Sequence, residues 1–192
     1  MAKAAKNQRV RIIGGQWRRR MIDVAALDGL RPTPDRVRET VFNWLQPRIE
    51  GARVLDAFAG TGALAFEALS RGAARAVLLE QQPAAIAAMQ VAAKMLAGPD
   101  DKCTEIVRAD AYHWLDRQQA TPPFDLVFLD PPFADDRMGH LCTLLVARGW
   151  LRDGARVYLE QPVGRAMQPE GLAMEKQQQA GQVVFGLYRL TS

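Results

Sequence analysis

The residues Arg53-Val54-Leu55-Asp56-Ala57-Phe58-Ala59-Gly60-Thr61-Gly62 are the most informative segment for the fold of this chain. It begins as a short apolar run that ends in an acid, and it continues into a glycine-rich turn. Residues 63–71 then follow a helical pattern that Gly72 ends, because glycine favours the position just after a helix. A strand, a glycine turn and a helix in this order are typical of loops whose backbone approaches a small ligand closely.

Four more apolar runs follow, and helical patterns or loops separate them. Near-continuous apolar runs that alternate with helices predict a parallel sheet covered on both faces. Residues 172–176 and 183–190 flank Gly181 and predict an antiparallel hairpin at one edge of the sheet. We therefore expect an α/β fold with a doubly wound, Rossmann-like sheet that is parallel except for this hairpin. The four runs lie at residues 76–80, 105–110, 124–130 and 155–160.

The segment before this sheet predicts a small β-hairpin. Residues 10–13 and 21–24 alternate like strands, and the first strand runs into a pair of glycines that signals a turn. A helix is expected to begin near Pro34, since proline is favoured in a first helical turn. We divide the chain into residues 1–30, a basic tail and hairpin, and residues 31–192, the sheet domain.

Basic charge is concentrated near the N-terminus. Residues 1–53 contain 12 Lys and Arg against 5 Asp and Glu, and residues 54–192 contain 13 against 16. Such segregation is expected of a protein that binds a polyanion, although a solvated tail would explain the charge equally well. Trp17 could stack on a base, or it could pack on the hairpin itself. The candidate RNA-binding residues are Arg9, Arg11, Trp17, Arg18, Arg19 and Arg20.

Several classes of protein are disfavoured by composition. Cys103 and Cys142 are far apart, and His113 and His140 have no ligand-like spacing, so we expect neither disulfides nor a metal site. No apolar run approaches the roughly 20 residues of a membrane span, and the basic N-terminus lacks the apolar core of a signal peptide. The sequence therefore predicts a cytoplasmic protein.

Acids stand at the ends of four predicted strands. Because the carboxyl ends of parallel strands meet at one edge of a sheet, we expect these acids to surround a ligand. Helix capping would explain one or two of them, but a buried edge does not collect four acids for stability, since each costs desolvation unless paired. The candidate cofactor-binding residues of these segments are Asp56, Phe58, Gly60, Thr61, Gly62, Glu80, Asp110 and Ala111.

These residues suit the parts of a nucleotide-like cofactor. Asp56 would meet an ammonium or hydroxyl group, and Glu80 would accept both hydroxyls of a ribose. Asp110 and Ala111 would lie where an adenine amino group is held. A dehydrogenase shares the ribose acid, so these segments by themselves leave NAD as an alternative cofactor.

The segment Asp130-Pro131-Pro132-Phe133 points to the chemistry. Two prolines remove backbone donors, which leaves a carboxylate, free carbonyls and an aromatic ring. Such a surface suits a planar group that bears N–H donors, such as a base amino group. The Asp130 carboxylate and the Pro131 carbonyl would grip the amino hydrogens, and Phe133 would stack on the base. We take all four residues as candidate catalytic residues, since positioning supplies much of the acceleration in a direct displacement.

These motifs resemble those of a known family. Residues 56–62 look like motif I of class I methyltransferases, and residues 130–133 look like their amino-methylating motif IV. Residues 11–18, 30–45 and 62–73 narrow the resemblance to the bacterial 16S ribosomal RNA guanine-N2 methyltransferases known as the RsmD family. The resemblance covers roughly residues 9 to 190.

The resemblance implies that the chain is an enzyme of the class I methyltransferase fold, and we expect it to be a monomer. Its methyl donor would be S-adenosylmethionine, and its acceptor a guanine of 16S rRNA in the assembled small subunit. Residues 33–39 would pack over the methionine end of the cofactor, which makes Thr33 and Arg38 candidate cofactor contacts. Two departures are that Arg19 stands where the family often has glycine, and that residues 92–93 are alanines where it often has asparagine.

Two other functions remain as alternatives. A DNA adenine-N6 methyltransferase shares the motif at residues 130–133, but the roughly 50 residues before motif I leave no room for a target-recognition domain. A non-catalytic RNA-binding assembly protein could have kept the fold. The complete motifs at Asp56 and Asp130 argue against that reading.

Overall fold

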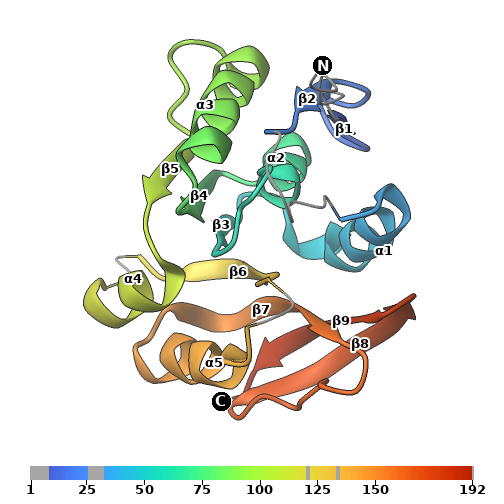
Figure 1. Cartoon of the computed structure of the whole chain (residues 1–192), viewed down its shortest axis with the longest axis vertical. Coiled ribbons are helices and arrows are strands. Elements are labelled where there is room, and N and C mark those ends of the chain that lie inside the picture. Colours follow the sequence, from blue (N-terminus) through green and yellow to red (C-terminus); the bar gives the residue numbers. More distant parts are fainter. Residues whose placement is uncertain (1–8, 26–32, 120–121, 133–134, 192) are drawn as a thin grey trace, which may run out of the picture.

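Five adjacent parallel strands, counted from one edge, form most of a seven-stranded sheet in the computed structural model of the chain (Figure 1). The structure describes residues 9–25, 33–119, 122–132 and 135–191. Its strand order is β5-β4-β3-β6-β7-β9-β8, and the last two strands are antiparallel to their neighbours. The strands are β3 (Arg53–Asp56), β4 (Arg75–Glu80), β5 (Thr104–Arg108), β6 (Phe124–Leu129), β7 (Leu151–Pro162), β8 (Leu172–Ala180) and β9 (Val183–Leu190).

The expected sheet and its C-terminal hairpin are thus confirmed. The order reverses at β3, because the chain moves outward to β4 and β5 and then returns to place β6 on the other side. This reversal is the point at which doubly wound sheets bind ligands. The segments that follow β3 and β6 are those with the glycine turn and the proline motif.

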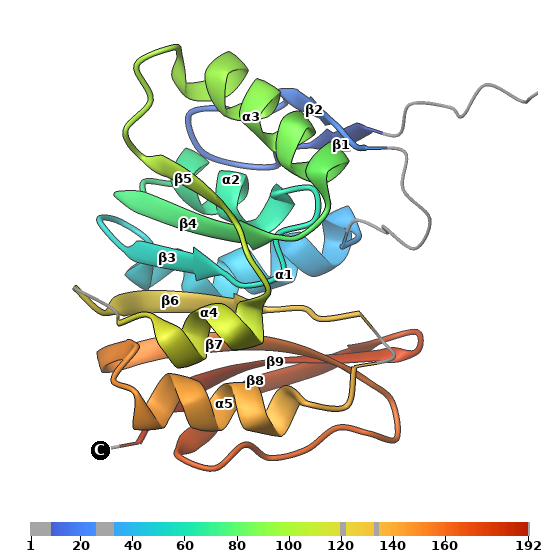
Figure 2. The ribbon, with the colours of Figure 1, turned by 60° about the vertical axis from the view of Figure 1, so that its left-hand side comes forward.

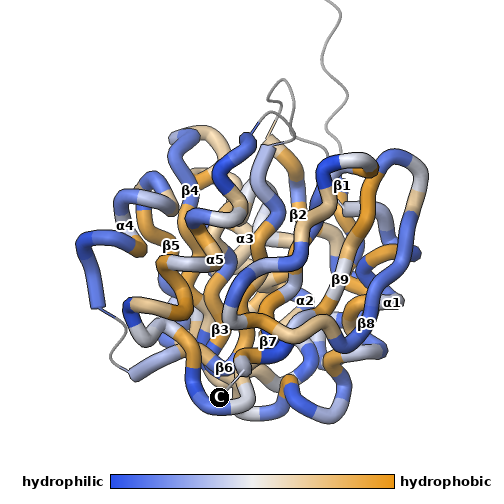
Figure 3. Tube along the Cα trace, turned by 90° about the horizontal axis from the view of Figure 1, so that it is seen from below, coloured by the Kyte–Doolittle hydropathy of each residue, from blue (hydrophilic) through white to orange (hydrophobic). Residues whose placement is uncertain are grey.

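Helices cover both faces of the sheet. α4 (Ala111–Arg117) and α5 (Met138–Ala147) pack on one face, and α1 (Asp35–Leu45) and α2 (Ala63–Ser70) lie behind the other (Figure 2). α3 (Pro83–Ala97) belongs to the α1 and α2 core. Figure 3 shows hydrophobic residues concentrated along the central strands and hydrophilic ones in the peripheral loops. Two apolar layers therefore stabilise one sheet, as burial of apolar surface on both faces requires.

Strand residues alternate between these two layers. In β6, Leu126 and Phe128 face the α1 and α2 side, while Val127 and Leu129 face the α4 and α5 side. The same alternation runs through the neighbouring strands, because successive side chains of a strand point to opposite faces. This alternation also determines the face of the sheet toward which the residue after each strand points.

The helix α4 was not anticipated from the sequence. Asp110 is its N-cap, and the Asp110 Oδ1 atom accepts the N–H of His113 at 2.9 Å. An acid just before a segment with buried Ala111 and Leu115 is a recognisable helix start. Asp110, for which the sequence predicts a ligand contact, thus also serves as a helix cap, the alternative left open for one or two of the four acids.

The N-terminal hairpin is confirmed but is closely integrated with the main core. β1 (Arg9–Arg11) pairs antiparallel with β2 (Met21–Asp23), and Val10 lies opposite Ile22. Val10, Ile12 and Ile22 belong to the same hydrophobic cluster as α1, α2 and α3. The hairpin is therefore packed on the sheet domain, and it is held there by buried contacts.

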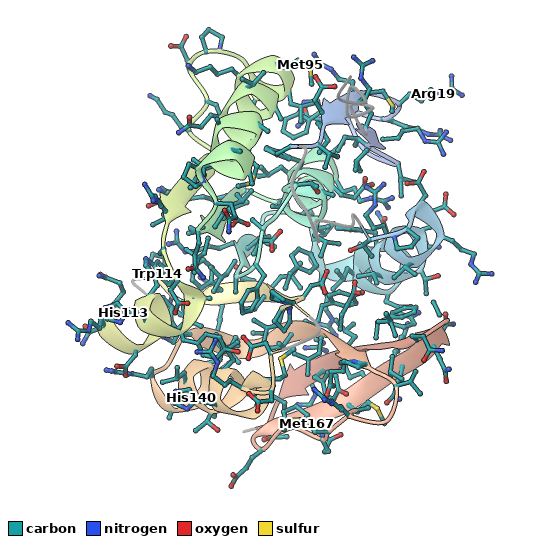
Figure 4. The ribbon with its side chains drawn as sticks, viewed as in Figure 1. Arg19, Met95, His113, Trp114, His140 and Met167 are labelled. Carbon is teal, nitrogen blue, oxygen red and sulfur yellow. The ribbon has the colours of Figure 1, made fainter. Side chains whose placement is uncertain are left out.

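The backbone at Arg19 adopts a conformation that favours glycine. Its φ is 71°, in the left-handed region that only glycine adopts without strain. The hairpin thus keeps a glycine-type turn even though an arginine stands there. Figure 4 places Arg19 at the outer side of the hairpin, far from His113 and His140 beside α4 and α5.

Candidate active site

Three acids share one face at the carboxyl end of the central strands. Asp56 ends β3, Asp130 follows β6, and Glu160 lies near the end of β7. Leu129 of β6 pairs with Leu159 of β7, so Asp130 and Glu160 are the next residues on adjacent parallel strands. Since Leu129 and Leu159 face α4 and α5, the two acids point to the opposite face. The sheet register therefore brings Asp130 and Glu160 side by side.

The Asp56 carboxyl is buried and lacks one hydrogen-bond partner. The residue is 2% exposed, and within the described chain its Oδ2 atom accepts no hydrogen bond. Burial raises its pKa to about 7, and the charge of Glu80 adds to this rise, while the backbone N–H groups of Ala65 and Phe58 act in the opposite direction. A buried, unpaired carboxylate oxygen is costly unless a donor or cation meets it.

The glycine turn after Asp56 has a shape that side chains would spoil. Gly60 has φ 52° and Gly62 has φ 74°, both in the left-handed region. A Cβ atom at Gly62 would lie 2.6 Å from the Phe66 ring, so glycine is required there for space as well. Thr61 is buried, and its hydroxyl oxygen accepts the N–H of Ala63 at 3.2 Å. Phe58 is half-buried, with its ring edge toward Tyr112 at 6.1 Å between centroids.

Glu80 ties the glycine turn to the start of α3. Its Oε2 accepts the N–H of Gly60 at 2.9 Å, and its Oε1 accepts the N–H groups of Gln81 at 2.7 Å and Gln82 at 2.8 Å. Three donors hold the carboxylate in one orientation at the rim. Its ribose contact stays a prediction, and the structure adds a role in shaping the loop.

Asp110 and Ala111 lie at the next strand end along the sheet. Asp110 caps α4, and its Oδ2 accepts a hydrogen bond from the side-chain amide of Gln81 at 3.1 Å. Ala111 is buried in the first turn of the helix. Their contact with an adenine also stays a prediction, because capping already accounts for one oxygen of Asp110.

The electrostatic environment of Asp130 is unusual. Burial raises its pKa well above the ordinary value, and the charges of Glu160 and Asp56 raise it further, while the Thr33 hydroxyl acts in the opposite direction. The Pro132 carbonyl accepts the N–H of Asp135 at 2.8 Å. Pro131 is half-buried beside Asp130, and Phe133 lies outside the described residues.

Thr33 reaches this site, whereas Arg38 does not. The Thr33 hydroxyl donates to Glu160 Oε1 at 3.4 Å. Arg38 is fully buried, and its guanidinium donates to the carbonyls of Thr33 and Arg11 and to the Asp35 carboxylate. Protein encloses this side chain, which holds the hairpin against α1, and its contact with the cofactor stays a prediction.

The predicted RNA-binding residues divide into four groups. Trp17 is 8% exposed and belongs to the main hydrophobic cluster, which supports the packing alternative, and its contact with RNA stays a prediction. Arg20 donates to the carbonyls of Met95 and Leu96 at the end of α3. Two others pair with acids while staying exposed: Arg9 with Asp23 at 2.8 Å and Arg11 with Asp35 at 3.0 Å.

The side chains of Arg18 and Arg19 are exposed and form no ion pair with any described acid. They are therefore the arginines of the hairpin whose charge is freest to meet an external anion.

Glu160 is the site residue that sequence reasoning missed. Its Oε1 accepts the Tyr158 hydroxyl at 2.6 Å, and the residue is 9% exposed. The signal was present, since the predicted strand 155–160 ends in an acid just as the other strands do. We had not added it to the set of rim acids.

Two cavities lie away from this rim. One of about 410 Å³ lies between the hairpin turn and the end of α2, at Gly15 and Arg71. The other, of about 350 Å³, lies beside α3 and β5, at Lys94 and Thr104. Neither is lined by a predicted catalytic or cofactor-binding residue. Within the described ranges, no group of three or more His, Cys, Asp and Glu could hold a metal ion, and no helix is long and apolar enough to cross a membrane.

Known proteins resemble this chain over nearly its whole length. The family described as Conserved hypothetical protein 95 matches residues 10–189. The ribosomal RNA small subunit methyltransferase D of Escherichia coli strain K12 is 44% identical over 182 residues, covering 94% of this chain and 89% of that protein. Its counterpart from Haemophilus influenzae is 38% identical over 181 residues, covering 94% of this chain and 93% of that protein.

A solved structure agrees with these relatives. The putative methyltransferase yhhF from Escherichia coli superposes with a TM-score of 0.84 at 40% identity, covering 95% of this chain and 98% of that one. With sequence, fold and rim motifs in agreement, this chain belongs to the family of the ribosomal RNA small subunit methyltransferase D proteins, the RsmD family.

Proposed function

We propose that this protein transfers a methyl group from S-adenosylmethionine to the exocyclic N2 of a guanine in 16S ribosomal RNA. The observation that carries the proposal is the alignment of Asp56 and Asp130 on one face of the rim, beside the glycine turn. The relatives' printed names, which specify ribosomal RNA of the small subunit, support the substrate class.

The rim fits the proposed cofactor in two respects. The unpartnered Asp56 Oδ2 is a buried acceptor for an ammonium or hydroxyl donor. Gly60 and Gly62 give the turn beside Asp56 its left-handed backbone, and glycine is required at position 62 because a Cβ atom there would clash with the Phe66 ring. Glu80 and Asp110 would complete the site at the ribose and adenine. Bound there, S-adenosylmethionine supplies an electrophilic methyl group.

The residues of this chain prepare the acceptor nitrogen. The lone pair of an exocyclic amino group is delocalised into the ring, so the group is a poor nucleophile. The Asp130 carboxylate and the Pro131 carbonyl would accept its two hydrogens and hold the nitrogen with its lone pair toward the methyl group. As the nitrogen gains a fourth bond it must lose a proton, and the adjacent Asp130 carboxylate would take it.

The hairpin is proposed as the RNA-binding part of the protein. Arg18 and Arg19 are adjacent on its turn, exposed, and not paired with any described acid, so they would contact RNA phosphates. We retain residues 1–30 as the RNA-binding region and residues 31–192 as the catalytic region, although the two share one core. We further propose that the protein is a monomer that acts in the cytoplasm on the assembled small subunit.

A methylation assay tests this function. Small subunits from a strain that lacks the enzyme are incubated with the protein and labelled S-adenosylmethionine, and the nucleosides are identified by mass spectrometry. We expect N2-methylguanosine from the parent protein, none from Asp130→Ala, and a parent-like yield from the exposed control Asp153→Asn. Label in another nucleoside, or full activity of Asp130→Ala, would overturn the proposal. Free 16S rRNA as a parallel substrate tests the need for the assembled subunit.

A further inference from the structure

Glu160 presents an anchored carboxylate directly beside Asp130. The Tyr158 hydroxyl donates to Glu160 Oε1 at 2.6 Å, and the Thr33 hydroxyl donates to the same atom at 3.4 Å. Among the residues that the structure describes, no hydrogen bond reaches Oε2. One oxygen is therefore fixed by two hydroxyl groups, and the other is left to meet a donor.

The base edge next to an acceptor amino group differs between guanine and adenine. Guanine places its N1–H donor beside its N2 amino donors, whereas adenine places the N1 acceptor beside its N6 amino donors. When both are ionised, two neighbouring carboxylates present hydrogen-bond acceptors and no donors. Asp130 and Glu160 together therefore match a donor-donor edge and oppose a donor-acceptor edge.

We propose that Glu160 selects guanine by accepting its N1–H while Asp130 holds the N2 amino group. This inference rests on the proposed function, because it assigns a specificity-determining residue to the same site. An enzyme for adenine would need a hydrogen-bond donor at this position. Rejection of the wrong base follows because an acceptor facing an acceptor leaves both groups unpaired in a buried site.

Without a bound base, the environment of Asp130 and Glu160 disfavours two ionised carboxylates. Burial raises the pKa of Glu160, whereas its hydrogen bonds from Tyr158 and Thr33 lower it. The pKa of Asp130 is also raised, by burial and by the charges of Glu160 and Asp56. Two ionised carboxylates side by side repel each other. A guanine edge offsets that repulsion because it offers each carboxylate an N–H donor.

Base analogues at the target position isolate the N1 contact. Small subunits are reconstituted with 16S rRNA that carries guanine, 2-aminopurine or 2,6-diaminopurine at the methylated site. All three bases carry the 2-amino group that receives the methyl group. In both analogues, however, N1 is a hydrogen-bond acceptor, whereas in guanine it carries a hydrogen. For the parent protein we expect single-turnover methyl transfer to both analogues to be slower than to guanine by on the order of 10- to 100-fold.

The variant Glu160→Gln should relax or reverse this preference. Its amide can turn an N–H donor toward the N1 acceptor of the analogues, so their rates should rise while the rate on guanine falls. Glu170→Gln is the matched control, because Glu170 is exposed in the loop before β8 and should keep the parent preference. Equal binding of S-adenosylhomocysteine by both variants would show that the fold and cofactor site are intact.

The outcomes separate this inference from the proposed function. If the parent protein methylates guanine and both analogues at similar rates, the assignment of Glu160 is overturned while the function stands. A Glu160→Gln variant with the parent's preference overturns it as well. If the parent protein does not methylate guanine at all, the proposed function itself fails. The analogue series on the parent protein decides the matter even if Glu160→Gln does not fold.

Discussion

Replacing Glu67 by alanine should detach the N-terminal hairpin from the sheet domain. Glu67 lies on α2 and is fully buried. Its two carboxylate oxygens accept the N–H groups of Ile13 at 2.7 Å and Gly14 at 2.8 Å, and Oε1 also accepts Arg71 Nε at 2.7 Å. Arg38 Nη1 lies 3.6 Å from Oε2. One side chain thus joins the hairpin turn to two arginines.

The expected loss of stability follows from what the alanine would leave behind. Two backbone N–H groups would lose their acceptor, at about 1–3 kcal/mol each if they stay dry. Two largely buried guanidinium groups would lose their counter-charge, and breaking such a pair typically costs about 3–5 kcal/mol. These contributions overlap because they share one carboxylate. We expect the free energy of unfolding to fall by about 3–5 kcal/mol, a large part of the roughly 5–15 kcal/mol of a typical domain.

Urea unfolding followed by circular dichroism measures this loss. Glu67→Gln keeps one acceptor oxygen and the side-chain volume, so its loss should be smaller than that of Glu67→Ala. Glu39→Gln, on the exposed side of α1, is the control and should change the free energy of unfolding by less than about 0.5 kcal/mol. A loss below about 1 kcal/mol for Glu67→Ala, with an unchanged denaturant slope, would refute the reasoning that this carboxylate holds the hairpin.

Four further predictions concern the site and the hairpin. Asp56→Asn should raise the free energy of unfolding at pH 8 by up to about 4 kcal/mol, and by much less at pH 4. The reason is that the pKa of Asp56 is raised to about 7 in the folded protein, so the parent protein loses stability as the pH rises from the pKa of the unfolded state to that of the folded state. Equal effects at both pH values would contradict the raised pKa. The same variant should bind S-adenosylhomocysteine more weakly by calorimetry, and unchanged affinity would remove Asp56 from the cofactor site. Arg19→Gly should raise the free energy of unfolding by about 0.5–1 kcal/mol, because relief of left-handed strain exceeds the entropy cost of glycine; a loss in thermal or urea unfolding would show the turn to be unstrained. Replacing Arg18 and Arg19 together should weaken binding of the small ribosomal subunit and lower the magnitude of the slope of log affinity against log salt by about 2, with cofactor affinity unchanged. A parent-like slope would show that these two arginines do not contact RNA phosphates.

Substitution serves better than truncation for testing the hairpin. Removing residues 1–20 would also remove Val10, Ile12 and Trp17 from the main hydrophobic cluster. The truncation would therefore destabilise the sheet domain as well as weaken RNA binding, and the two effects could not be separated. Exposed side chains such as Arg18 can be changed without that consequence.

The elements that sequence patterns predicted are those whose causes are local. β9 was predicted at residues 183–190 and lies at Val183–Leu190, because its apolar run and the glycine turn before it are adjacent in sequence. The glycine turn at residues 60–62 was likewise predicted, since the left-handed φ of Gly62 depends on the residue itself. α4 was missed although its cap is local, because Asp110 had been assigned to a ligand.

The fold class and the strand ends at which Asp56, Glu80, Asp110 and Asp130 stand follow from the sequence, because the period of apolar residues and the turn chemistry are encoded along the chain. Which side chains meet depends instead on how the elements pack in three dimensions. The register of β6 against β7 placed Glu160 beside Asp130, and packing of the hairpin on α2 buried Trp17 and Arg38. Burial and pairing depend on residues far apart in sequence. A charge or aromatic ring that looks free in the sequence can therefore be enclosed once the chain folds.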